Sequence, residues 1–229
     1  MIGTIVPKLA KLPAGHNRLW PELRPGVALG FVLYGDTAVS LHLGHRPSSG
    51  FEFCRARSLD KDALRKAFSF IQKAAVLDDL EDTLAVAAPV RGKSAVRVSF
   101  CGGVTCGRVG DPLLTQDGVL ETASLDDLMA HKLKAMLARP EKKDCEDIAA
   151  MIRAGCSVSR GLAAAQALFG AAFQPAVALK ALARLDGAAP GGLSRADRST
   201  LASAARVVGI LPVVELRSRS LSIPIASSR

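Results

Sequence analysis

A short apolar run that ends in a glycine turn limits the folds available to this chain more than any other feature. Residues 30–34 (GFVLY) predict a buried strand, and the Gly35-Asp36 turn leads from it into a helix over residues 37–45. The Pro/Ser/Gly turn at 47–50 then predicts a second strand at 51–54. A strand, a helix and a returning strand in close succession are typical of a sheet with helices packed against it.

The rest of the first half adds further strands and one more helix. An amphipathic helix is predicted at 59–74, and strands at 83–88 and 95–101 complete a small sheet. The acidic run at 78–82 is interpreted as a solvated hairpin turn.

Beyond Ser124 the pattern changes to one helix after another. Ser124 and Asp127 resemble a capping box at the start of the first of these helices. The predicted helices cover residues 124–139, 143–153, 159–169, 175–185 and 194–208.

The pattern as a whole predicts an α+β chain, with a small mixed sheet flanked by helices and then a C-terminal helical domain. We place the sheet domain at residues 1–123, the helical domain at 124–212 and a basic tail rich in Ser and Arg at 213–229. The predicted sheet holds Val32, Phe51 and Val98.

The charge of the chain favours a phosphate-bearing partner without identifying one. The formal net charge is +9, and a basic surface attracts nucleotides and nucleic acids. The charge is also compatible with a simple excess of Lys and Arg that serves no such partner, because no dense basic run is present. The apolar stretch at 161–182 is broken by polar residues and a proline, which argues against a membrane span. Five scattered cysteines and no secretory signal predict a cytoplasmic protein with reduced thiols.

Charged residues interrupt the apolar faces of the helices at 124–139 and 143–153. On a helical wheel Lys132 falls in the middle of the first apolar stripe, Arg139 at its edge, and Asp144 within the next apolar face. A buried charge is costly unless it meets a partner or a ligand. Lys132 and Asp144 therefore either face one polar cleft, or Lys132 extends to solvent and Asp144 merely occupies the first turn of its helix.

The glycine turn after the first strand suits a phosphate group. The N-terminus of a helix presents free N–H groups and the positive end of the helix dipole. Residues 50 and 52 point to one side of the following strand, where two carboxylates could hold Mg²⁺ against a nucleoside triphosphate. Only Glu52 is a carboxylate, because position 50 is glycine. Asp36 either restores some negative charge to this site or is an ordinary N-cap of the helix, and the N-cap is the favoured interpretation.

Two segments of the chain resemble the signatures of one family. Residues 33–53 (LYGDTAVSLHLGHRPSSGFEF) and 123–148 (ASLDDLMAHKLKAMLARPEKKDCEDI) are similar to motifs of the AbiEii/AbiGii toxins. That family belongs to the DNA polymerase β-like nucleotidyltransferases. The resemblance extends loosely over residues 19–185 and implies a nucleotidyltransferase-like fold for the sheet domain.

The resemblance also implies roles for individual residues. Lys132 matches the lysine that contacts the nucleotide phosphate, and Asp144 matches its polar partner, so these two are the catalytic candidates. Glu52 matches the second metal carboxylate. Triphosphate binding is implied for Gly35, Thr37, Lys132 and Arg139.

The chain departs from the family pattern at the implied metal site. Gly50 stands in place of the first carboxylate, Ser99 aligns with the third, and Asp36 occupies a position where a small residue is usual. We therefore expect Mg²⁺ to bind weakly or not at all. Restoring the pattern with Gly50→Asp, Glu52→Asp and Asp36→Gly is expected to strengthen metal binding.

By resemblance, the chain transfers a nucleotide from a nucleoside triphosphate to an RNA, such as tRNA, or to a protein. It would do so as the toxin of a bacterial toxin–antitoxin system, with a cognate antitoxin protein as partner. The alternative is a catalytically impaired nucleotide- or RNA-binding protein of the same fold, which Gly50 and Asp36 favour. The sequence leaves the nucleotide, the acceptor and the oligomeric state open.

Overall fold

The computed structural model describes residues 3–90, 95–185 and 190–223. These residues divide into two units. The first takes in the described residues of 1–107, 111–123 and 218–229, and the second takes in those of 108–110 and 124–217. Residues 218–223 therefore belong with the sheet and not with the helices that precede them in the chain.

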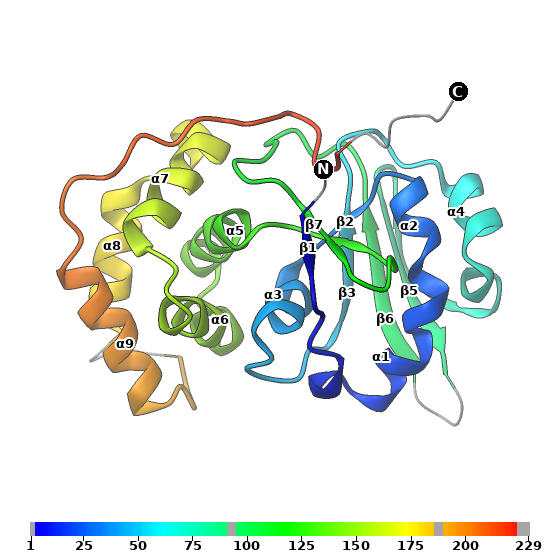
Figure 1. Cartoon of the computed structure of the whole chain (residues 1–229), viewed down its shortest axis with the longest axis horizontal. Coiled ribbons are helices and arrows are strands. Elements are labelled where there is room, and N and C mark those ends of the chain that lie inside the picture. The colour runs from blue at the N-terminus through cyan, green and yellow to red at the C-terminus, as the bar shows by residue number, and fades with distance from the viewer. Residues whose placement is uncertain (1–2, 91–94, 186–189, 224–229) are drawn as a thin grey trace. The chain divides into compact units, whose positions relative to one another are not determined.

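An eight-stranded mixed sheet forms the frame of the first unit (Figure 1). The strands are β1 (Thr4–Ile5), β2 (Val32–Tyr34), β3 (Gly50–Cys54), β4 (Ala75–Leu80), β5 (Thr83–Pro89), β6 (Ala95–Cys101), β7 (Leu113–Thr115) and β8 (Glu121–Thr122). Their order across the sheet is β1-β7-β8-β2-β3-β6-β5-β4. β3 pairs antiparallel with β2 and parallel with β6. Val32, Phe51 and Val98 lie on these three central strands, so the prediction for the sheet is confirmed.

Alternation along the strands gives the sheet one aromatic face. Phe51 and Phe53 on β3 and Phe100 on β6 are buried, and neighbouring rings stack with centroids 6.4 and 5.5 Å apart. The rings of Phe31 and Phe68 lie 5.4 and 5.0 Å from that of Phe100. The residues between them on β3 and β6 point to the opposite face, which is where the candidate site begins.

Helices complete the first unit. They are α1 (Ala14–Leu19), α2 (Pro25–Ala28), α3 (Gly35–Leu43) and α4 (Lys61–Ala67), with 3₁₀ turns at Leu9–Lys11, Trp20–Leu23 and Ser69–Lys73. α3 follows β2 directly, as predicted. The single helix predicted at 59–74 is wrong in its second half. Phe68 takes an extended conformation and buries its ring against Phe100, so α4 ends at Ala67.

The acidic run at 78–82 is only partly a turn. Asp78 and Asp79 lie in β4 at the edge of the sheet, and Glu81 and Asp82 make the turn to β5. Asp79 Oδ1 lies 2.5 Å from Lys61 Nζ, and this ion pair offsets the negative charge along the edge strand.

The second unit consists of helices, as predicted. They are α5 (Leu125–Ala138), α6 (Lys142–Arg153), α7 (Val158–Phe169), α8 (Pro175–Arg184) and α9 (Arg195–Arg206), with a 3₁₀ turn at Gly170–Ala172. Serine caps begin α5, α7 and α9, because Ser124, Ser157 and Ser194 each accept a hydrogen bond from a backbone N–H three residues later. The capping interaction predicted between Ser124 and Asp127 is confirmed, with an N–Oγ distance of 3.1 Å.

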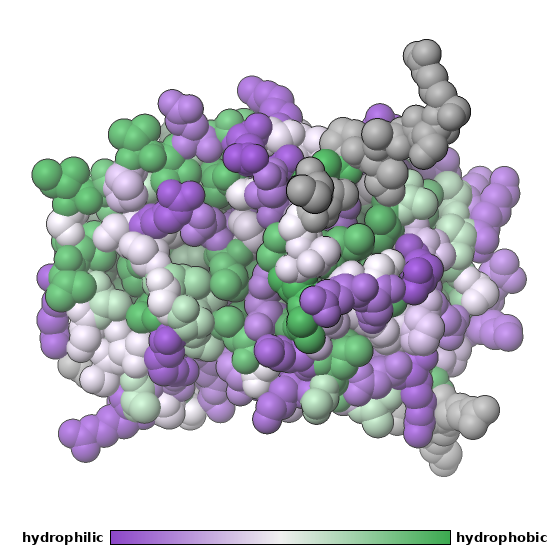
Figure 2. Space-filling view, in the orientation of Figure 1, coloured by the Kyte–Doolittle hydropathy of each residue, from purple (hydrophilic) through white to green (hydrophobic). Residues whose placement is uncertain are grey.

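The chain beyond α9 carries exposed apolar side chains. Val207, Ile210 and Val213 are 82%, 99% and 89% exposed. Figure 2 shows hydrophobic surface at the upper left, where Figure 1 draws this segment.

No helix within the described residues has both the length and the apolar character needed to cross a membrane.

Candidate functional site

The turn between β2 and α3 is built around a glycine. Gly35 has a φ of +72°, which other residues rarely adopt, and a β-carbon at this position would collide with Glu52 Oε2. The Glu52 carboxylate, on the neighbouring strand β3, therefore lies directly against the turn. Tyr34 precedes the helix and provides no side-chain cap, so the N–H groups of the first turn need other acceptors.

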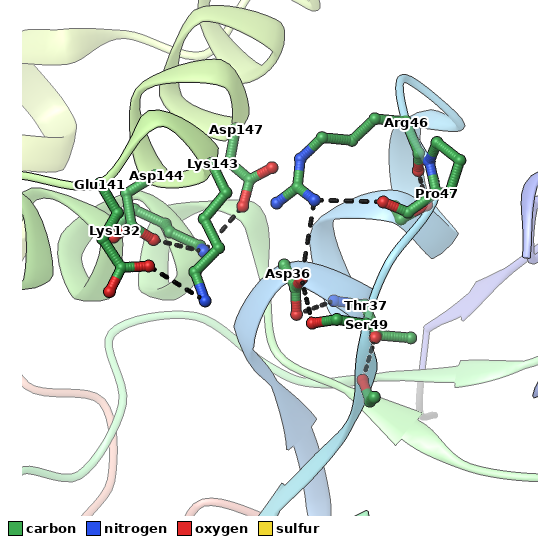
Figure 3. A network of polar contacts seen from close by, with 12 residues as sticks. Asp36, Thr37, Arg46, Pro47, Ser49, Lys132, Glu141, Lys143, Asp144 and Asp147 are labelled. Atoms are coloured by element: carbon green, nitrogen blue, oxygen red, sulfur yellow. Dashed lines mark hydrogen bonds and ion pairs between the residues drawn. The ribbon is translucent and has the colours of Figure 1, made fainter. Parts of the chain in front are cut away.

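Asp36 supplies one of these acceptors from inside the first turn of α3. Its Oδ1 accepts a hydrogen bond from the Thr37 N–H at 3.1 Å (Figure 3). Its Oδ2 accepts one from Ser49 Oγ at 3.2 Å and lies 3.6 Å from Arg46 Nη1. The prediction of Asp36 as the N-cap is wrong, because Tyr34 holds that position. The carboxylate nevertheless lies at the positive end of the helix dipole.

The backbone N–H and the hydroxyl of Thr37 both donate hydrogen bonds to other groups of the protein. Its side chain is fully buried, and its hydroxyl donates a hydrogen bond to the carbonyl of Gly50. Its N–H is bound to Asp36. The turn that would receive a phosphate is therefore lined by two carboxylates of the chain itself, Asp36 and Glu52.

The open face of the sheet beside Glu52 carries a basic group that was not predicted. The register of β3 and β6 pairs Gly50 with Arg97 and Glu52 with Ser99. Arg97 Nε donates a hydrogen bond to Ser99 Oγ at 3.3 Å. A hydroxyl and a guanidinium thus lie together at the position aligned with the third carboxylate. Strand alternation places residues 97 and 99 on one face, but the partner strand could not be read from it.

Gly50 has no room for a side chain. A β-carbon at this position would lie 2.5 Å from the carbonyl oxygen of Arg97 and 3.1 Å from its Cβ. The carbonyl belongs to the strand paired with β3, so it cannot move away without disturbing the ladder. The expectation that Gly50→Asp restores a metal ligand therefore conflicts with the structure.

The residues on this face do not fit a magnesium site. Mg²⁺ demands octahedral oxygen ligands and is normally held by carboxylates together with substrate phosphates. Of the three aligned positions, only Glu52 offers a carboxylate, and Arg97 adds a positive charge beside them. Across the part of the chain that the structure describes, no three His, Cys, Asp or Glu side chains gather in a way that could hold a metal ion.

Lys132 forms a buried ion cluster in the second unit. Its Nζ lies 2.8 Å from Asp144 Oδ1 and 2.7 Å from Asp147 Oδ2 (Figure 3). The three side chains are 8%, 4% and 0% exposed. Burial alone would lower the pKa of Lys132, but the charge of Asp147 and hydrogen bonds to both aspartates raise it above its ordinary value. Lys132 therefore does not extend to solvent but meets Asp144, whereas the polar cleft expected for these two residues and their roles in catalysis stay predictions.

Asp147 is a third member of this cluster that was not predicted. It follows Asp144 by one helical turn on α6, so the two carboxylates share a face. A signal was present in the sequence, because Asp147 is the second aspartate of the Lys-Asp-x-x-Asp-Ile motif. Asp144 Oδ2 is buried without a hydrogen-bond partner among the described residues, so the cluster retains a spare acceptor.

Arg139 lies apart from the buried cluster. It follows the last residue of α5, and its side chain is 69% exposed and pairs with Glu141 at 2.7 Å. Pro140 comes next and ends the helix. The role expected for Arg139 in triphosphate binding stays a prediction.

The β2–α3 turn and the Lys132 cluster both lie in the segments that carry the family resemblance. A family model described as the nucleotidyl transferase AbiEii toxin of type IV toxin–antitoxin systems matches residues 22–205. This match spans more than half of the chain and includes the β2–α3 turn, Glu52 and the Lys132 cluster. None of the curated proteins matches the chain.

Proposed function

Since the chain belongs to the family of AbiEii nucleotidyltransferase toxins of type IV toxin–antitoxin systems, we propose that it binds a nucleoside triphosphate but transfers the nucleotide slowly or not at all. The observation that carries this proposal is the packing of Gly50 against the Arg97 carbonyl, which leaves no position for the first metal carboxylate. Nucleotidyl transfer needs charge neutralisation at the attacking and leaving oxygens, normally by ions held between carboxylates. Glu52 alone is a weak site for such an ion, so Mg²⁺ binds weakly or not at all.

The β2–α3 turn supports the binding of a triphosphate. Asp36 and Glu52 hold carboxylate oxygens against the N-terminus of α3, a position that phosphate oxygens also favour. A triphosphate would replace these oxygens at Gly35 and Thr37. Arg46, whose Nη1 lies 3.6 Å from Asp36, adds a cation to the same turn. The competing carboxylates lower the affinity without removing the site.

Asp36→Asn is expected to raise the affinity for ATP by about three- to tenfold, because it removes a negative charge that competes with phosphate. Asparagine keeps the size of the side chain. Calorimetric titration with each ribonucleoside triphosphate, with and without Mg²⁺, measures the change. Asp62→Asn is the matched control, because that carboxylate is 83% exposed on α4, and we expect it to leave the affinity unchanged. Absence of triphosphate binding by both the wild type and Asp36→Asn would refute the proposal.

A second candidate is an active toxin, and the Lys132 cluster favours it. The motif residues Lys132, Asp144 and Asp147 are all present and in contact. In this case the nucleotide passes to an RNA, such as tRNA, or to a protein in the bacterial cytoplasm, and an antitoxin protein is the partner. Transfer of label from each triphosphate to an acceptor distinguishes the two candidates.

A further inference from the structure

A pocket of about 390 Å³ in the first unit lies away from the β2–α3 turn. Arg55, Arg57, Ser220 and Ser222 line it, together with an apolar wall from residues 27–29 and Ile223. Gly50 begins β3 and Arg55 follows the last residue of that strand. At about 3.3 Å per residue the two positions are roughly 16 Å apart, so the pocket is a separate site.

Arg55 is held in place by hydrogen bonds and a ring contact with neutral groups. Its Nε donates a hydrogen bond to the Arg57 carbonyl at 3.2 Å, and its Nη2 donates one to the Ser58 carbonyl. Its guanidinium lies 5.1 Å from the centre of the Phe31 ring. Burial lowers the pKa of Arg55, and the charge of Arg57 acts in the same direction, while the nearby charges of Asp60 and Asp82 act against it. The side chain is therefore fixed by neutral groups.

Arg57 places a second guanidinium beside the first. It is exposed, and within the described residues neither arginine lies within ion-pair distance of a carboxylate. The two adjacent cations repel each other although Asp60 and Asp82 lie nearby, and a bound anion would relieve that repulsion. Arginine is also the side chain best suited to phosphate oxygens, because its planar group donates two parallel hydrogen bonds.

The remaining walls fit the other parts of a nucleotide. Ser220 Oγ donates to the Ser222 carbonyl at 3.1 Å, which fixes this edge of the pocket. Gly30 lies beside this edge, since a β-carbon there would come 3.4 Å from Ser222 Oγ. The apolar side chains of Val27 and Leu29 offer a surface for a base or a ribose. The volume lies within the range of about 300–1,000 Å³ that is usual for small-molecule sites.

We propose that Arg55 and Arg57 bind the phosphate group of a nucleotide, either free or within an RNA strand. This site goes beyond the triphosphate proposed at the β2–α3 turn and does not depend on it. The basic net charge of +9 would assist capture of an RNA strand by the same pocket.

The test uses Arg57→Gln and two probes, a fluorescent single-stranded RNA dodecamer and adenosine monophosphate. For whichever probe the wild type binds, we expect Arg57→Gln to weaken binding about five- to tenfold, because one charge-assisted contact is lost. For RNA, the slope of log K against log salt should also fall by about 0.7. Arg65→Gln on α4 is the matched control, because it removes the same charge outside the pocket, and we expect a change below about twofold.

Ala56→Trp tests the pocket without changing its charge. Ala56 lies in the pocket lining, and a tryptophan there would fill the space that the nucleotide needs. We expect it to weaken binding at least as much as Arg57→Gln does. If the substitutions weaken the binding of RNA alone, the phosphate belongs to an RNA strand. If they weaken the binding of adenosine monophosphate alone, the ligand is a free nucleotide. Equal binding by Arg57→Gln and Arg65→Gln, unchanged binding by Ala56→Trp, or binding of neither probe would overturn the proposal. None of these results depends on Asp36, so a failure here is distinct from a failure at the turn.

Discussion

Replacing Lys132 with alanine is expected to lower the free energy of unfolding by about 3–5 kcal/mol. The substitution leaves Asp144 and Asp147 as two buried carboxylates on one helical face with their cation removed. An unpaired charge removed from water costs far more than a lost surface ion pair. Urea denaturation measures the effect as a lower midpoint at unchanged slope.

A surface pair on the same helix provides the control. Lys142 and Glu146 are four residues apart on α6, with side chains 48% and 27% exposed. Lys142→Ala is therefore expected to cost less than about 0.5 kcal/mol. Replacing the whole cluster with apolar side chains of similar volume, Lys132→Met, Asp144→Leu and Asp147→Leu together, is expected to recover most of the stability. Equal stability of Lys132→Ala and Lys142→Ala would contradict the buried ion cluster.

Gly50→Asp is expected to destabilise the protein by about 1–3 kcal/mol and to leave Mg²⁺ binding weak. The β-carbon alone meets the Arg97 carbonyl at 2.5 Å, so Gly50→Ala should cost nearly as much. A glycine replaced at a compatible site normally gains stability, because the unfolded chain loses freedom. Gly209→Ala is such a control, since no atom lies within 4 Å of the added carbon.

Magnesium titration of the variant with Gly50→Asp, Glu52→Asp and Asp36→Gly tests whether metal binding is limited by missing carboxylates or by missing space for them. Glu52→Asp and Asp36→Gly supply the family pattern at the other two positions but do not relieve the contact between Gly50 and Arg97. We therefore expect the variant with all three substitutions to bind Mg²⁺ no better than the wild type. Tighter metal binding together with undiminished stability would show that β3 and β6 accommodate the carboxylate, and would contradict the close approach described here.

Much of the frame could be predicted from the spacing of apolar residues. β3 alternates Phe51 and Phe53 with outward residues, and the helices of the second unit follow serine caps such as Ser124 and Ser194. These signals are local, because each depends on residues within a few positions in the chain. The meeting of Lys132 with Asp144 could also be predicted, because two charges on apolar faces need partners.

The remaining features depend on contacts between distant residues. Nothing near Gly50 indicates that Arg97 will be its neighbour, because the register of β3 and β6 fixes that pair. The end of α4 at Ala67 depends on the burial of Phe68 against Phe100 and not on a local breaker. Tertiary packing therefore decides both the interrupted helix and the character of the candidate metal site.

The most direct test of impaired transfer is incubation of the purified protein with each labelled ribonucleoside triphosphate, Mg²⁺ and total RNA. We expect the wild type to transfer no more label to RNA or protein than its Glu52→Ala variant does, while calorimetry detects triphosphate binding by the wild type. Robust transfer by the wild type would contradict the account, whether or not Glu52→Ala abolishes it.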